Sequence, residues 1–141
     1  MIFTSSDAGE KPTFASWGAY GATKAAVNYV IKMLTLEEAD ITAVGLYPGV
    51  VNTPLVQGIF RGECELSLHV SWSNNYTGAN DALDNSGMSQ DELKVYMDIV
   101  KPRLVEPHQP GSVIANLALS ATADLRGEIL FWDDQKFSAF L

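Results

Sequence analysis

Two stretches, IFTSS at residues 2–6 and ITAVGLYPG at residues 41–49, decide the fold of this 141-residue chain. Each is a short apolar run that ends in turn-forming residues, as buried β-strands do. Between them, apolar and small residues recur at helical spacing from a candidate N-cap at Ser16, which predicts a helix that closes near residues 37–40. Strand, helix and strand with short connections make a βαβ unit, which implies parallel strands and a right-handed crossover.

The rest of the chain adds elements of the same kind. Residues 54–88 show no sustained periodicity, but Ser89 and Glu92 form a capping-box pattern for a helix that ends before Pro102. A further helix fits residues 111–121, and a last strand fits residues 127–132. We therefore expect an α/β fold of three strands and three helices. Because both faces of a parallel sheet must be covered, three strands look like part of a larger sheet.

Composition and charge exclude several classes of function. The net charge is −8, without a local Lys/Arg cluster, which argues against nucleic acid and anionic membranes as partners. The single Cys64 excludes an internal disulfide, and we find neither a signal peptide nor an apolar run long enough to span a membrane. We expect a soluble cytoplasmic protein. The isolated His69 and His108 give no argument for a metal site.

Tyr20 and Lys24 carry the clearest chemistry. They lie four residues apart, on one face of the predicted helix. An ammonium group one turn away and the positive end of the helix both favour the phenolate form of a tyrosine. Such a tyrosine can give a proton to a carbonyl oxygen while hydride reaches the carbon, or take it back in reverse. A half-buried tyrosine beside a solvated lysine is the alternative interpretation of this spacing alone.

The context of this pair narrows the choice. A strand ending in Ser5 and Ser6 precedes the segment WGAYGATKAA at residues 17–26, and PGVVNT at residues 48–53 follows the next strand. In this order the three elements resemble the short-chain dehydrogenase/reductase family, within it the fungal carbonyl reductases akin to sepiapterin and benzil reductases. The resemblance implies an NAD(P)-dependent enzyme, with NADP favoured, that reduces a carbonyl to an alcohol. Its fold would be the C-terminal part of a doubly wound, Rossmann-type parallel sheet.

The resemblance also implies roles for single residues. Tyr20 would be the general acid/base, and Lys24 would favour its phenolate form and bind the nicotinamide ribose. Ser6 would hold the substrate carbonyl, with Ser5 as the alternative because the loop to Tyr20 is about one residue longer than in the family. For both serines, turn formation at the strand end is an equally good interpretation.

The remaining residues of the implied site bind the cofactor. Pro48 and Gly49 would bring the backbone close to the nicotinamide, and the main chain of Val51 and the hydroxyl of Thr53 would bind its carboxamide. Without the family, Pro48-Gly49 is an ordinary turn and Thr53 is a helix cap before Pro54. Aromatic and methionine side chains of the later segments would line a substrate pocket or pack in the core: Phe60, Trp72, Tyr76, Met88, Tyr96 and Met97.

The chain also departs from the family. The Gly-rich turn that receives a pyrophosphate is absent, so by the resemblance we expect the N-terminal nucleotide-binding half to be missing from this sequence. We divide one partial domain into a catalytic βαβ segment (1–60), an irregular lid or insertion (61–88) and C-terminal helices with the last strand (89–141). Residues 62–85 are either a substrate lid or a translated intron. Two alternatives to an active enzyme remain. One is a fragment that cannot bind the cofactor by itself, and the other is an independent binding domain that matches the motif by accident. The implied partner is a small carbonyl or alcohol, and full-length relatives would be homo-oligomers.

Overall fold

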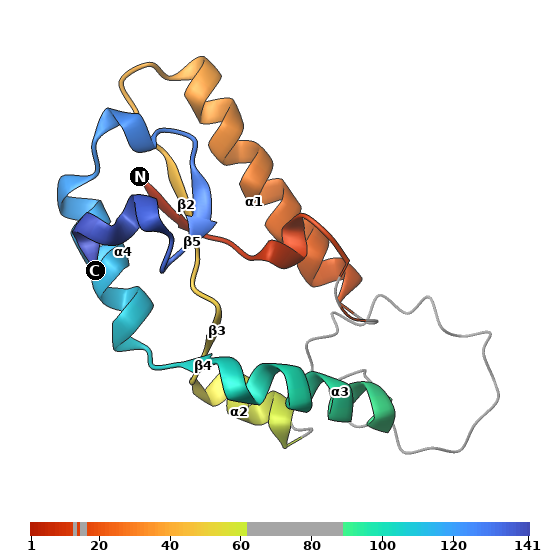
Figure 1. Ribbon diagram of the computed structural model, residues 1–141. Helices are drawn as coiled ribbons and strands as arrows, with labels where there is room; N and C mark the ends of the chain where they lie inside the picture. Colours follow the sequence, from red (N-terminus) through yellow and green to blue (C-terminus); the bar gives the residue numbers. More distant parts are fainter. Residues whose placement is uncertain (13, 15–16, 62–88) are drawn as a thin grey trace.

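The fold is built on a short parallel sheet between two helices (Figure 1). The computed structural model describes residues 1–12, 14, 17–61 and 89–141. Three strands, β1 (Ile2–Thr4), β2 (Val44–Tyr47) and β5 (Ile129–Phe131), pair in the order β1-β2-β5, and both pairings are parallel. Figure 1 shows α1 (Gly18–Glu37) and α4 (His108–Ser120) on opposite sides of this sheet. The predicted α/β fold with parallel strands is confirmed.

The central strand β2 is buried on both faces because a helix covers each of them. Toward α4, Val44 and Leu46 belong to a cluster of fully or nearly fully buried residues whose other members are Val113, Leu117, Leu125 and Phe137. Toward α1, a Cβ atom on Gly45 would lie 2.8 Å from the Ile31 side chain and 2.9 Å from that of Ile129. Glycine at this position therefore lets the helix pack closely on the sheet.

Helix α1 ends as predicted at Glu37, whereas its start differs from the prediction. Trp17 holds the N-cap position and makes no side-chain capping hydrogen bond. The predicted cap, Ser16, lies outside the described residues. At the other end, the Arg126 guanidinium donates hydrogen bonds of 2.7 Å to the Thr35 carbonyl and 2.8 Å to the Glu38 carbonyl. Carbonyls of a last helical turn have no partner inside the helix, so Arg126 satisfies two of them.

A second group of elements lies beyond the carboxyl edge of the sheet. Strands β3 (Val50–Val51) and β4 (Leu104–Val105) form a parallel pair, and α2 (Pro54–Phe60) packs beside α3 (Gln90–Val100). Figure 1 shows both helices away from the sheet, joined to it through β3 and β4. The contact between the helices is a cluster of buried apolar residues: Ile59, Leu93, Tyr96 and Val100. Sequence periodicity did not predict α2, β3 or β4, which have seven, two and two residues.

The predicted bounds of three elements were wrong by a few residues. Helix α4 starts at His108 rather than at residue 111, because Pro110 fits a first turn, whose amide groups have no acceptor inside the helix. Strand β2 starts at Val44 rather than 41, and β5 spans 129–131 rather than 127–132. Gly127 has φ of +79°, so the chain turns there before it can pair as a strand.

Two further boundaries were predicted correctly. The Ser89–Glu92 capping box is present in both directions, and α3 ends at Val100, before Pro102. Four short 3-10 turns complete the described chain: η1 (Asp7–Gly9), η2 (Lys101–Arg103), η3 (Ala123–Leu125) and η4 (Gln135–Phe140).

Candidate active site

The predicted site residues gather at the carboxyl edge of the sheet. The amide of Ser5 donates a 2.9 Å hydrogen bond to the Leu46 carbonyl, and the amide of Trp132 donates one of 3.0 Å to the Tyr47 carbonyl. The segments after β1, β2 and β5 are therefore neighbours in space as well as in pairing order. In open parallel α/β sheets, ligands bind outside the carboxyl ends of the strands.

Tyr20 and Lys24 lie in the first two turns of α1, close to the end of β1. The Lys24 ammonium group is 5.6 Å from the centre of the Tyr20 ring and donates a 3.1 Å hydrogen bond to the Thr4 carbonyl. The Trp17 ring meets the Tyr20 ring edge to face, with 5.5 Å between their centres. Lys24 thus joins the tyrosine helix to the strand that carries the serines. Within the described residues, the Tyr20 hydroxyl has no hydrogen-bond partner.

The two serines have different surroundings. Ser5 is only 2% exposed, and its hydroxyl donates a 2.6 Å hydrogen bond to the side-chain carbonyl of Asn28. Ser6 is half-buried at the N-cap of η1, where its hydroxyl oxygen accepts a 3.2 Å hydrogen bond from the Ala8 amide and donates to the Asp7 carboxylate at 3.3 Å. The Ser5 hydroxyl is thus enclosed, whereas that of Ser6 lies in a partly exposed turn.

A line of hydrogen-bonded polar groups continues from Ser5 to the exposed Glu10. The Asn28 amide donates a 3.1 Å hydrogen bond to the Tyr47 hydroxyl, which donates one of 2.7 Å to the Glu10 carboxylate. Burial, and then the neighbouring Glu10 carboxylate, raise the pKa of Tyr47 well above its usual range, so this hydroxyl stays protonated. Sequence reasoning missed Asn28, Tyr47 and Glu10. The spacing of Tyr20, Lys24 and Asn28, four residues each, is the signal that places Asn28 on the same helix face.

The predicted cofactor residues follow β2 in order. Gly49 has φ of +71°, a conformation that favours glycine, and a Cβ atom there would meet only the Trp132 indole, at 3.8 Å. Val51 pairs with Val105 between β3 and β4, and the Thr53 hydroxyl accepts a 3.4 Å hydrogen bond from the Val56 amide as the N-cap of α2. Pro48-Gly49 is therefore a turn, and Thr53 is the helix cap that one interpretation of its sequence predicts.

An aromatic cluster joins α1 to the outer helices. Tyr96 is 2% exposed, and its ring centre lies 5.0 Å from that of Phe14 and 5.6 Å from that of Trp17. Phe60 adds a ring 6.0 Å from Tyr96. Burial, and then the Tyr20 side chain, raise the pKa of Tyr96 to about 12. Tyr96 is therefore a core residue and does not line an open pocket. Trp72, Tyr76 and Met88, the other residues considered for that role, lie outside the described residues.

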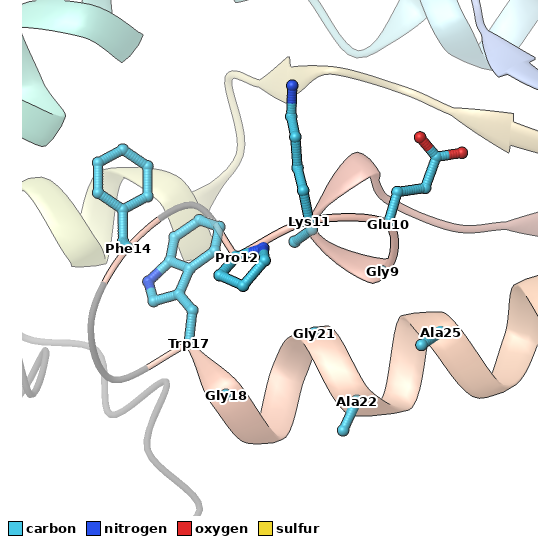
Figure 2. Close-up of a pocket in the computed structure, with 11 residues that line it drawn as sticks. Gly9, Glu10, Lys11, Pro12, Phe14, Trp17, Gly18, Gly21, Ala22 and Ala25 are labelled. Carbon is cyan, nitrogen blue, oxygen red and sulfur yellow. The ribbon is translucent and has the colours of Figure 1, made fainter.

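A shallow cavity of about 250 Å³ lies on a different face of α1 (Figure 2). The loop at residues 8–12 and the rings of Phe14 and Trp17 form one wall, and the small residues Gly18, Gly21, Ala22 and Ala25 of the helix form the other. Neither Tyr20 nor Lys24 lines it, so this cavity is separate from the predicted catalytic pair.

The described residues hold neither a cluster of metal ligands nor a helix suited to span a membrane. Across residues 1–61 and 89–141, apart from residues 13, 15 and 16, no three His, Cys, Asp or Glu side chains gather as metal ligands would. His108, the first residue of α4, is exposed, and His69 lies outside that part. In the same part of the chain, no helix has the length and apolarity needed to cross a membrane.

These features define a class of protein. A parallel sheet between helices, with its polar residues gathered beyond the carboxyl ends of the strands, is the arrangement of doubly wound α/β proteins of the Rossmann type.

Comparison with known proteins names the family. The sequence pattern of the short chain dehydrogenase family matches residues 1–63. An uncharacterized oxidoreductase of Saccharomyces cerevisiae, YIR035C, is 29% identical over 143 aligned positions that cover 100% of this chain and 48% of the relative. A benzil reductase ((S)-benzoin forming) of the same yeast is 29% identical over 140 positions that cover 96% of this chain and 45% of that protein. Over its whole length the chain is therefore similar to members of the short-chain dehydrogenase/reductase family, whose sequence pattern its first 63 residues match.

Solved structures agree with this assignment. The crystal structure of the yeast short chain dehydrogenase/reductase YIR035C matches with a TM-score of 0.74 at 29% identity. The match covers 99% of this chain and 48% of the YIR035C chain. The KRED1-Pglu enzyme matches with a TM-score of 0.66 at 32% identity, over 91% of this chain and 45% of its own. The chain thus spans about half the length of the relatives it matches, and its α/β fold is a partial Rossmann-type fold.

Proposed function

We propose that this chain carries the catalytic part of an NAD(P)-dependent oxidoreductase that reduces a carbonyl to an alcohol. The observation that carries the proposal is the position of Lys24, whose ammonium group is 5.6 Å from the Tyr20 ring centre and bound to the Thr4 carbonyl next to the serine turn. This geometry supports a proton donor, a cation and a hydroxyl acting at one edge of the sheet. A tyrosine and a lysine that merely pack side by side would not need the link to β1.

In the proposed site, Tyr20 is the general acid/base. It gives its hydroxyl proton to the carbonyl oxygen as that oxygen gains negative charge, and the ammonium group of Lys24 stabilises the phenolate that remains. Ser6 donates a hydrogen bond to the same oxygen. We favour Ser6 over Ser5 because the Ser5 hydroxyl is 2% exposed and already donates to Asn28.

The proposed cofactor residues lie at the same edge. Gly49 has φ of +71° and an exposed backbone, which suits close approach of a flat ring. Pro48 and Gly49 would face the nicotinamide, the main chain of Val51 and the hydroxyl of Thr53 would bind its carboxamide, and Lys24 would bind its ribose. When bound, the cofactor supplies the hydride. By resemblance to the carbonyl reductases we propose NADP over NAD.

The proposed context follows from the same resemblance. We assign the catalytic role to residues 1–60, an irregular lid or insertion to 61–88, and the last helices and strand to 89–141. The substrate is a small carbonyl compound. A homo-oligomeric, cytoplasmic enzyme is the corresponding proposal for the whole protein.

The test is binding and turnover by the purified 141-residue chain. NADPH and NADH are titrated by nicotinamide fluorescence, and benzil, the substrate in one relative's name, is the first ketone assayed. Tyr20→Phe removes only the hydroxyl, and we expect its kcat to fall about a thousandfold because general acid–base catalysis contributes about 10²–10⁴. Tyr29→Phe is the matched control, because Tyr29 lies on the same helix and is 66% exposed.

Each outcome decides the proposal. Saturable NADPH binding, with turnover lost in Tyr20→Phe and kept in Tyr29→Phe, supports it. Equal turnover in both variants would remove Tyr20 from the chemistry. A folded chain that binds neither nucleotide would favour the alternative, a fragment that has the catalytic residues but no activity alone.

A further inference from the structure

We propose that Glu10 and Tyr47 are positioning residues, whose hydrogen bond fixes the Ser6 turn against the Pro48-Gly49 turn. The proposal rests on the function proposed above, in which Ser6 binds the substrate oxygen and Pro48-Gly49 faces the nicotinamide. It adds Glu10 and Tyr47, which in that scheme contact neither the substrate nor the nicotinamide.

Four elements are joined by one line of hydrogen bonds. Ser5, after β1, donates to Asn28 on α1 at 2.6 Å, and Asn28 donates to Tyr47 at the end of β2 at 3.1 Å. Tyr47 then donates to Glu10, in the loop after η1, at 2.7 Å. Every donor points toward the next acceptor, and the last acceptor is a carboxylate. Hydrogen bonds to charged acceptors are shorter and stronger than neutral ones, so Glu10 is a strong end for this line.

The Ser6 turn is held at both ends by this line. Ser5 is fixed on Asn28 at the start of the turn, and Glu10 is fixed on Tyr47 at its end. Between them, the Ser6 hydroxyl accepts from the Ala8 amide at 3.2 Å, and the Ser6 carbonyl accepts from the Gly9 amide at 3.0 Å. If the Glu10 end is released, only the Ser5 end of the line still holds the turn.

Tyr47 connects this turn to the next one. It is the last residue of β2, 3% exposed, and it immediately precedes Pro48. Its ring meets the Phe131 ring of β5 edge to face at 5.3 Å, which fixes the ring between strands. The hydroxyl of a rigid side chain in the central strand is therefore the reference point to which the Glu10 loop is bound.

Nothing else in the described chain explains a carboxylate at position 10. Glu10 is exposed and lines the cavity in Figure 2, and its carboxylate accepts a hydrogen bond from the Tyr47 hydroxyl. A solvated surface acid would not need to approach a buried tyrosine.

The first test measures the turn without any need for activity. Amide hydrogen exchange is followed by NMR on the 141-residue chain at Ala8 and Gly9, whose amides bond to Ser6. We expect exchange at both amides to be about tenfold faster in Glu10→Ala and in Tyr47→Phe, the size set by one lost charge-assisted bond. The double variant should be no faster than either single one, because both remove the same bond. Glu10→Gln keeps an acceptor and should stay close to the parent.

The control and the contrary results are also defined. Glu37→Ala removes an exposed carboxylate at the far end of α1 and should leave both amides unchanged. Unchanged exchange in Glu10→Ala, or effects that add in the double variant, would overturn the proposal. Glu10→Ala serves this purpose even if Tyr47→Phe folds poorly, because Glu10 is exposed.

The second test separates positioning from stability. In the ketone reductase assay we expect Glu10→Ala and Tyr47→Phe to lower kcat about tenfold with KM for the ketone within about twofold, and Glu10→Gln to restore most of kcat. Normal kcat in both variants, together with loss of activity in Tyr20→Phe, would overturn the positioning role alone. If Tyr20→Phe stays active, the proposed function fails, while the exchange experiment still decides whether Glu10 and Tyr47 hold the turn.

Discussion

Replacing Gly9 by alanine is the perturbation for which the structure gives the clearest magnitude. Turn η1 lies directly on α1: a Cβ atom on Gly9 would be 2.6 Å from the Lys24 carbonyl carbon and 2.7 Å from the Ala25 amide nitrogen. Both atoms belong to the backbone in the middle of a helix, so a change of side-chain rotamer cannot relieve the overlap. The turn must move away from the helix, and Ser6 would move with it.

The cost of this movement is that of overpacking against a rigid neighbour. Added methyl groups in well-packed sites lower the free energy of unfolding by about 1–3 kcal/mol. Because the added methyl group of Gly9→Ala would meet backbone, we expect a loss of about 3 kcal/mol. For a chain of this size, each 1 kcal/mol lowers Tm by about 3 °C, so we expect a fall of about 9 °C. Catalytic turnover, where present, should fall as well, because the Lys24–Thr4 hydrogen bond spans the same contact.

The assay is thermal and urea unfolding followed by circular dichroism, with Gly111→Ala as the matched control. Gly111 lies in α4, and a Cβ atom there would meet nothing within 4 Å. Alanine is a better helix former, so this control should gain about 0.5–1 kcal/mol. A Gly9→Ala variant within about 0.5 kcal/mol of the parent would refute the close packing of η1 on α1.

Three further predictions concern the frame of the site. Arg126→Met keeps the apolar stem but removes the hydrogen bonds to the Thr35 and Glu38 carbonyls. In urea unfolding it should lower the free energy of unfolding by about 2 kcal/mol, against about 0.5 kcal/mol or less for Arg103→Met at an exposed position. Equal losses in the two variants would contradict the capping role of Arg126. Ser89→Ala removes the capping box of α3 and should cost about 1 kcal/mol, a result that an unchanged urea midpoint would disprove. Burial raises the pKa of Tyr96 to about 12, from about 10 in the unfolded chain. The folded state therefore holds this proton more tightly, which stabilises the fold by about 3 kcal/mol below pH 10. This contribution is lost as the pH rises from 10 to 12. Tyr96→Phe cannot lose it, so the parent should lose more stability than this variant between pH 8 and pH 12; parallel losses would contradict this origin.

The sequence was sufficient for those parts of the fold in which one chemical requirement acts alone. The strand ending in Tyr47 is apolar because both of its faces are covered, and Pro48-Gly49 stops it because proline cannot donate and Gly49 needs a positive φ. The Ser89–Glu92 pair predicts a helix start for an equally local reason, because the two residues cap each other's backbone amides. The spacing of Tyr20 and Lys24 likewise predicts that they share a helix face.

The missed parts depend on contacts between distant segments. Strands β3 and β4 have two residues each, too few for any period, and exist because Val50–Val51 meets Leu104–Val105 in space. The link between Glu10 and Tyr47 joins residues 37 positions apart, and neither sequence neighbourhood is unusual. The proposed preference for Ser6 over Ser5 also depends on such contacts, because two adjacent serines differ in burial and hydrogen bonding only once the chain is folded.

The strand order β1-β2-β5 has a consequence for how the chain is made. Leu46 of the central strand pairs with Thr4 on one side and with Leu130 on the other, so the second pairing must wait until residues 129–131 have left the ribosome, more than eighty residues after Leu46. Parallel pairings this distant in sequence form slowly, because the entropy of the closing loop is lost before the stabilising contacts form. During synthesis, the Val44–Tyr47 edge that later receives β5 stays open to other chains. Protection of that edge by a chaperone would therefore matter most just before residues 129–131 emerge.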